Sequence, residues 1–183
     1  MSAVAERFRN VAAGFTDRAD AVPDSAWDNP TPCEGWVARD VVRHLAEWMP
    51  GFFLGSAGLA VPTGPSVDDD VTGAWRALRD ALQAALDDPE IAPREYDSPA
   101  GRMTVEHAID QFGISDILVH TWDLARSTGL DETLDADEVG RAVRAMAPHD
   151  EAMRKGGHYG PRVDVPDDAD DQTKLLAFSG RRP

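Results

Sequence analysis

Apolar residues recur at three- and four-residue steps in five stretches of the chain, with polar residues between them. This spacing is typical of amphipathic helices that turn one face toward a core. The predicted helices span 2–21, 36–57, 67–87, 104–128 and 135–147. Because no stretch of useful length alternates with a period of two, the pattern predicts an all-α protein. We expect an up-and-down four-helix bundle with an extra helix and an irregular C-terminal tail.

Prolines and a glycine mark several of the predicted boundaries. Pro23 and Pro89 follow the first and third helices, and Gly129 is placed to cap the end of the fourth. Pro50 lies inside the second helix and should bend or end it, because proline removes a backbone donor and clashes with the preceding turn. The uncharged segment 51–66 after it is then expected over or near any site on that helix.

The remaining segments are predicted to be irregular. Residues 89–101 hold three prolines and a glycine, so we expect a connector there. The tail, 148–183, is rich in glycine, proline and aspartate, with one short apolar run at 175–178. We expect this tail to dock on the helices, so that residues 1–183 form a single domain.

The charge balance excludes two classes of partner. The chain has 183 residues, with 33 acidic against 18 basic side chains and a formal net charge of −15. This excess of acid argues against nucleic acids and anionic membranes, because both require a basic surface. The uncharged stretch 48–67 is broken by prolines and glycines, which is not the pattern of a membrane span. The sequence leaves the choice between a monomer and a homodimer open.

The cysteine count and the N-terminal charges bear on the compartment. Cys33 is the only cysteine, so no internal disulfide can form. Residues 1–20 carry charges throughout and do not resemble a signal peptide. Both features favour a reducing interior, and we expect a cytoplasmic protein. Cys33 lies between the first two predicted helices, and a lone cysteine in such a connecting loop is more often structural than nucleophilic.

One face of the fourth predicted helix carries unusual side chains. At about 100° per residue, Asp116 and His120 lie about 40° apart and one turn from each other, with Asp123 close to the same direction. The same face also holds apolar residues, so it is expected to face the core. Burying such polar groups without partners costs several kcal/mol. A divalent metal chelated by Asp116 and His120 would compensate that cost.

The second predicted helix supplies a candidate third ligand. His44 lies at the edge of its apolar stripe and can meet Asp116 and His120 if the second and fourth helices pack together. Two imidazoles and a carboxylate suit Zn²⁺ or another late divalent ion, with a coordination position left open. The alternative is that Asp116 and His120 are a surface pair and that His44 is a satisfied core histidine.

Other polar residues allow two interpretations each. Asp40 lies one turn before His44 and could hold its second ring nitrogen, but it could equally cap the helix. Asp123 could hold a nitrogen of His120 in the same way. The acidic run 68–70 is expected to cap the third helix rather than to bind calcium. We expect four tryptophans in the core, with one or two at a pocket mouth: Trp36, Trp48, Trp75 and Trp122.

Three segments carry a family resemblance. The first runs from residue 29 to 45 as NPTPCEGWVARDVVRHL, and the second from 116 to 125 as DILVHTWDLA. Both resemble the mycothiol-dependent maleylpyruvate isomerase family, which lies within the wider DinB-like superfamily. The tail 178–183, FSGRRP, is similar to the end of a short, largely uncharacterised branch of that family. These motifs are specific as a set rather than singly.

The resemblance implies a DinB-like four-helix bundle with one divalent metal, held by His44, Asp116 and His120. It favours Zn²⁺, with Ni²⁺ or Fe²⁺ as other choices, and a thiol cosubstrate such as mycothiol. The isomerase typically has glutamate at the position of Asp116. It also has a second, C-terminal domain that contributes to substrate binding, and we expect this chain to be too short for a comparable one.

The resemblance therefore implies a metal- and thiol-dependent transferase or isomerase that acts on a small electrophilic molecule. The expected partners are a small-molecule thiol and that electrophile. Two alternatives remain: a non-catalytic, metal-stabilised helical module that binds a ligand or a protein, and a metal-dependent hydrolase. No catalytic residue is identified from the sequence.

Overall fold

The computed structural model describes residues 2–98, 101–146, 154 and 160–183. The α-helices within these residues are α1 (Ala3–Ala21), α2 (Ala38–Met49), α3 (Val71–Asp87), α4 (Val105–Ala108), α5 (Ile114–Thr128), α6 (Ala136–Met146) and α8 (Asp171–Phe178). Short 3₁₀ and π-helical segments are η1 (Asp24–Ala26), η2 (Pro50–Gly55) and η3 (Ile109–Gly113), and a hairpin is formed by β1 (Glu95–Ser98) and β2 (Gly101–Thr104).

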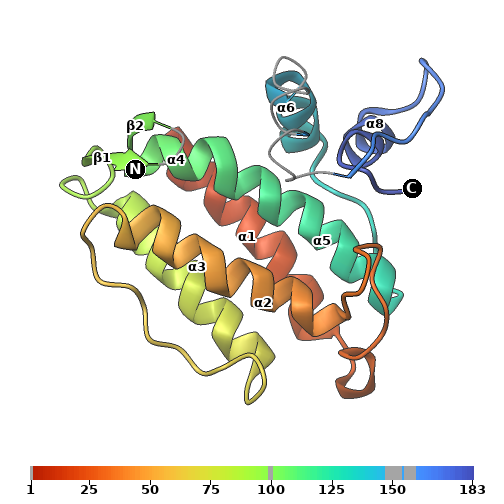
Figure 1. Ribbon diagram of the computed structural model, residues 1–183, viewed down its shortest axis with the longest axis horizontal. Helices are drawn as coiled ribbons and strands as arrows, with labels where there is room; N and C mark the ends of the chain where they lie inside the picture. Colours follow the sequence, from red (N-terminus) through yellow and green to blue (C-terminus); the bar gives the residue numbers. More distant parts are fainter. Residues whose placement is uncertain (1, 99–100, 147–153, 155–159) are drawn as a thin grey trace.

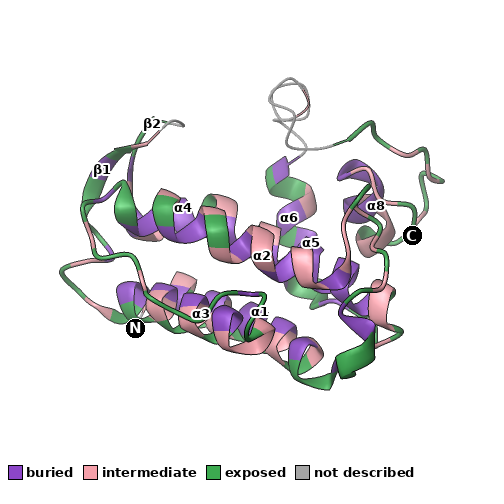
Figure 2. Ribbon diagram, turned by 60° about the horizontal axis from the view of Figure 1, so that its bottom comes forward, coloured by how far each residue is buried: buried purple, intermediate pink, exposed green. Residues whose placement is uncertain are grey.

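Four long helical segments form a bundle, and α4, η3 and α5 run on as one of them (Figure 1). Helix α1 packs against α3 and α5, and α2 packs against the same two helices. The purple faces of these helices turn toward one another in Figure 2, so the core lies along the bundle axis. The predicted all-α, DinB-like bundle is confirmed. None of the helices in the described residues is both long and apolar enough to cross a membrane.

Local capping explains where the helices begin. The Ser2 hydroxyl accepts a hydrogen bond from the Ala5 N–H at 3.1 Å, which starts α1. Helix α3 begins at Val71 rather than at residue 67, because the Asp70 carboxylate accepts from the Gly73 N–H at 2.8 Å. The predicted capping role of the acidic run 68–70 is therefore confirmed for Asp70.

Pro50 divides the second predicted helix. Helix α2 ends at Met49, and the π-helical segment η2 continues the path to Gly55. Pro50 has no backbone N–H and cannot donate a hydrogen bond within the α-helix. The backbone continues from it in the wider π-helical conformation, which occurs mostly as single turns. Phe52 of η2 then packs beside Trp48, with ring centroids 5.7 Å apart.

The fourth bundle segment also contains a π turn. It runs from Val105 to Thr128, and Gly129 ends it in the left-handed conformation with φ of 71°, as predicted for a C-cap. At Gly113, within η3, a Cβ would lie 3.2 Å from the ring of Phe53. The absence of a side chain at this glycine lets η3 approach η2 closely.

Two segments that were expected to be irregular each contain a short regular element. Part of the expected connector forms the β1–β2 hairpin, because Tyr96 and Met103 pair across it and turn their buried side chains to the core. The tail contains the helix α8, capped by Asp170 and packed against α6 through the apolar run at 175–178. Residues 147–153 and 155–159 of the predicted helix end and tail lie outside the described residues.

Candidate metal centre

Three side chains from two helices converge where α2 packs against α5. His44 lies on α2, whereas Asp116 and His120 lie one turn apart on α5. His44 Nε2 is 3.3 Å from Asp116 Oδ2, and His120 Nε2 is 3.5 Å from Asp116 Oδ1. One donor atom from each residue lies within 4.8 Å of the other two. The structure thus brings together the three residues that the sequence singled out.

These separations fit the dimensions of a divalent-metal site. Zn–N and Zn–O bonds are about 2.1 Å long, so two ligand atoms of a tetrahedral ion lie about 3.4 Å apart. The contacts from Asp116 to His44 and His120, 3.3 and 3.5 Å, are close to this value. Two imidazole nitrogens and a carboxylate oxygen are also a donor set that Zn²⁺ and other late divalent ions accept.

The site is closed on one side and open on the other. The side chain of His120 is 6% exposed, but those of Asp116 and His44 are 22% and 33% exposed. A small molecule can therefore approach past His44 and Asp116. Three donor residues with one accessible side would leave a metal ion a free coordination position, whereas a closed structural site has four protein ligands.

Two half-buried tryptophans border the site. The Trp36 ring lies 5.1 Å from that of His44 and 5.9 Å from that of His120, measured between centroids. Trp48 Nε1 donates a hydrogen bond to Asp116 Oδ2 at 3.1 Å. Trp48 therefore fixes the carboxylate that lies between the two histidines. Trp75 and Trp122 are in the core, as predicted.

Behind His120 lies a buried polar network. Asp123, with no exposed surface, places Oδ2 2.9 Å from His120 Nδ1. This contact is an ion pair when His120 is protonated. Arg181 of the tail donates two hydrogen bonds to the same carboxylate, with Nη2 2.7 Å from Oδ2 and Nε 3.2 Å from Oδ1. The Cys33 thiol completes the network, with Sγ 3.4 Å from Asp123 Oδ2.

Cys33, His120 and Asp123 form a second set of donor atoms within 4.8 Å of one another. A guanidinium nitrogen of Arg181 already lies 2.7 Å from Asp123 Oδ2 and 3.3 Å from Cys33 Sγ. A second positive charge at this position would be repelled by the guanidinium. The set of His44, Asp116 and His120 is therefore better suited to a cation.

Electrostatics around His120 favour charged forms of these groups in the metal-free protein. Burial would lower the pKa of His120, but the negative charge of Asp116 and the carboxylate of Asp123 outweigh it and raise this pKa to about 10. Burial would raise the pKa of Asp123, yet His120 and Arg181 hold it at about 2. The pKa of Asp116 is also lowered, because the two histidines and Trp48 outweigh its burial.

Of the two interpretations of Asp40, the structure shows the capping one. Its Oδ2 accepts from the Val37 N–H at 3.0 Å, and its Oδ1 accepts from Arg43 Nε at 3.2 Å. Both of its oxygens therefore have partners in the first turns of α2, and the contact with a ring nitrogen of His44 stays a prediction. The Asp123 carboxylate, in contrast, lies 2.9 Å from Nδ1 of His120, the residue that the sequence suggested as its partner.

The sequence analysis missed the role of Arg181. This residue stood in the tail motif FSGRRP without an assigned function. Its partner Asp123 is 58 positions away along the chain. One signal in the sequence pointed to such a contact: the face of α5 carries two carboxylates, Asp116 and Asp123, but only one histidine to balance their charge.

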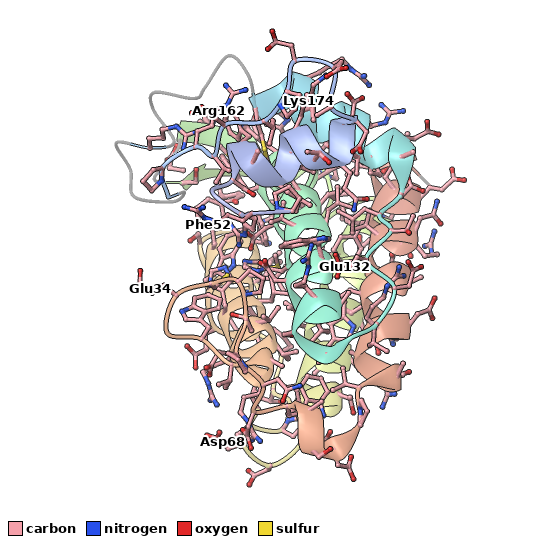
Figure 3. The ribbon with its side chains drawn as sticks, turned by 90° about the vertical axis from the view of Figure 1, so that its right-hand side faces the viewer. Glu34, Phe52, Asp68, Glu132, Arg162 and Lys174 are labelled. Atoms are coloured by element: carbon pink, nitrogen blue, oxygen red, sulfur yellow. The ribbon has the colours of Figure 1, made fainter. Side chains whose placement is uncertain are left out.

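Figure 3 shows where the tail lies relative to the bundle. The labelled residues Arg162 and Lys174 belong to the tail, which lies at the top in this view, and Glu132 belongs to the connection between α5 and α6. Phe52, also labelled, lies on η2, the segment that follows the histidine-bearing helix α2. The first turn of the segment 51–66 therefore reaches the site through its contact with Trp48.

Comparisons with known proteins find a family match and two relatives. Residues 8–52, which include His44, match the mycothiol maleylpyruvate isomerase N-terminal domain family. Two uncharacterised proteins of Mycobacterium tuberculosis, Rv0738 of strain H37Rv and MT0763 of strain CDC 1551, are each 26% identical to the chain over 154 residues. The similarity covers 83% of this chain and 83% of each relative. No solved structure matches the chain significantly.

Proposed function

Because residues 8–52 match the mycothiol maleylpyruvate isomerase N-terminal domain family, we propose that the protein is a divalent-metal enzyme that uses a small thiol. The reaction is the transfer of the thiol to a small electrophilic molecule, or the isomerisation of that molecule through thiol addition. The observation that carries this proposal is the convergence of His44, Asp116 and His120 within 4.8 Å on one partly open side of the bundle.

In this proposal His44, Asp116 and His120 hold the metal, with Zn²⁺ as the preferred ion and Ni²⁺ or Fe²⁺ as alternatives. When bound, the ion supplies Lewis acidity and lowers the pKa of a thiol beside it. Mycothiol is the thiol that the family name suggests. The formal net charge of −15 disfavours binding to nucleic acid, so the proposed partners are small molecules.

In this proposal, residues around the site position the ligands and control access to them. Trp48 donates to Asp116 and keeps its carboxylate between the two histidines. Asp123 lies against the far nitrogen of His120 and leaves Nε2 turned toward the site. The exposed edges of His44 and Asp116 admit the thiol and the electrophile. The stacked ring of Trp36 limits the access of water to His120 on that side.

Two other functions use the same ligands. A metal-dependent hydrolase would need the open side for water, and a non-catalytic module would use the ion to stabilise the fold. The partial exposure of His44 and Asp116 favours a reactive site over a purely structural one. These alternatives give different results in one experiment.

The test is thiol binding to the Co²⁺-substituted protein, because a thiolate on Co²⁺ gives a charge-transfer absorption. We expect this band to appear when a small thiol is added to wild-type protein and to the Cys33→Ser variant alike. The variant is the control, since it removes the chain's own thiol. A screen of electrophiles with the same thiol should then give metal-dependent product. Turnover of esters or amides without thiol would favour a hydrolase, and binding of metal with neither response would favour the non-catalytic module.

A further inference from the structure

We propose that Arg181 of the C-terminal tail is a positioning residue for the metal centre, acting on His120 through the buried carboxylate of Asp123. This inference rests on the proposed metal site of His44, Asp116 and His120. It assigns to the tail a part in the site itself, in addition to any contribution to the stability of the fold.

The contact between Arg181 and Asp123 is bidentate. Nε and Nη2 of the guanidinium lie 3.2 and 2.7 Å from Oδ1 and Oδ2 of the carboxylate, respectively. The Arg181 side chain is 12% exposed and Asp123 is fully buried. A fork of this kind fixes the rotation of a carboxylate as well as its position. The plane of the Asp123 carboxylate is therefore set from the tail.

That carboxylate is the group behind His120. Its Oδ2 lies 2.9 Å from His120 Nδ1, on the opposite side of the ring from Nε2, which faces Asp116. Carboxylates in this position orient metal-binding histidines and favour the ring form whose other nitrogen is free to coordinate. A carboxylate that rotated would leave the ring of His120 without this support.

The backbone holds Arg181 in place before its side chain makes any contact. The Arg181 N–H donates to Leu176 O at 2.8 Å, and the Gly180 N–H donates to Ala177 O at 3.1 Å. Together with φ of 85° at Gly180, these bonds form the Schellman motif that ends α8. In addition, Arg181 Nη1 donates to Ser179 O at 2.9 Å. The guanidinium is thus presented to Asp123 by a defined helix end.

A lysine at position 181 could not reproduce both hydrogen bonds of Arg181. An ammonium group supplies the charge that the buried carboxylate needs, but it is a point charge and lacks the planar fork. Arg182, the next residue, provides a matched control. It is exposed and has no side-chain contact recorded within the described part of the chain.

The test compares Zn²⁺ affinity by competition with a chromophoric chelator. The proteins are the full-length wild type, Arg181→Met, Arg181→Lys, Asp123→Asn, the double variant Arg181→Met/Asp123→Asn and the control Arg182→Met. We expect Arg181→Met to bind Zn²⁺ about 10- to 100-fold more weakly and Arg182→Met to bind as the wild type does. Because Arg181 acts through Asp123, the double variant should lose no more affinity than Asp123→Asn alone. Unfolding of the metal-free variants is measured in parallel.

Wild-type Zn²⁺ affinity in both Arg181→Met and Arg181→Lys, even with a lower melting temperature, would overturn the inference and leave the proposed function standing. Losses that add in the double variant would overturn the route through Asp123. If Arg181→Met does not fold, Arg181→Lys decides, with weaker Zn²⁺ binding expected despite the retained charge. A wild-type protein that binds no divalent metal would overturn the proposed function together with this inference.

Discussion

The affinity of the protein for Zn²⁺ should rise steeply with pH. In the metal-free protein the pKa of His120 is raised to about 10, so the ring is protonated at neutral pH. A histidine must lose that proton before it can coordinate a metal. Asp116 has a lowered pKa and is already ionised, so it releases none. Binding at pH 7 should therefore release at least the one proton held by His120.

The size of the effect follows from this proton count. One displaced proton changes the apparent affinity about tenfold per pH unit, or about 1.4 kcal/mol. From pH 7 to pH 9, both below the pKa of His120, we expect a gain of about 100-fold, or about 2.7 kcal/mol. The metal-free protein should show the opposite trend. Because the pKa of His120 is raised from 6.5, its stabilising effect is complete below pH 6.5 and is lost as the pH rises toward 10.

Calorimetric titration with Zn²⁺ in buffers of different ionisation enthalpy measures the released protons directly. Melting curves with and without metal at several pH values give the stability difference independently. The stabilisation by metal should grow with pH between 7 and 9. An affinity that does not change over this range, or a titration that releases no proton, would refute the assignment of His120 as a ligand that is protonated in the free protein.

Three further substitutions test the site and its scaffold. Trp48→Phe removes the 3.1 Å bond to Asp116 and should lower the free energy of unfolding by about 1.5 kcal/mol in urea titrations; no change would mean that this bond is replaced by water. Phe15→Ala empties a site with no exposed surface and should cost about 3–5 kcal/mol by thermal melting. Arg7→Met removes the short ion pair to the buried Glu138 and leaves it the longer 3.5 Å contact with Arg141, which should cost about 2 kcal/mol and speed hydrogen exchange in α6; unchanged exchange would contradict this tether.

Helix periodicity made the bundle predictable. The apolar stripes depend on local spacing alone, so the four bundle segments and the pairing of Asp116 with His120 on one face followed from the sequence. The boundaries were less accurate, because capping depends on which of several neighbouring carboxylates turns back to the helix. Asp70 rather than the start of the acidic run caps α3, and Asp40 caps α2.

The parts that were not predicted depend on contacts between distant segments. The β1–β2 hairpin is short and mixed in polarity, and its pairing is stabilised by burying Tyr96 and Met103 against the bundle. Helix α8 is stable through its packing on α6, which no local pattern reveals. The contact of Arg181 with Asp123 requires both α5 and the end of α8 to be in place, so it could be found only in three dimensions.

The central claim is that His44, Asp116 and His120 form a divalent-metal centre, and metal content per chain tests it most directly. The measurement is elemental analysis after Zn²⁺ loading and dialysis, for the wild type, for His120→Ala and for His107→Ala, the last replacing an exposed histidine of α4. We expect about one equivalent of zinc in the wild type and in His107→Ala, and none in His120→Ala. One equivalent retained in His120→Ala, or no zinc in the wild type, would contradict the account.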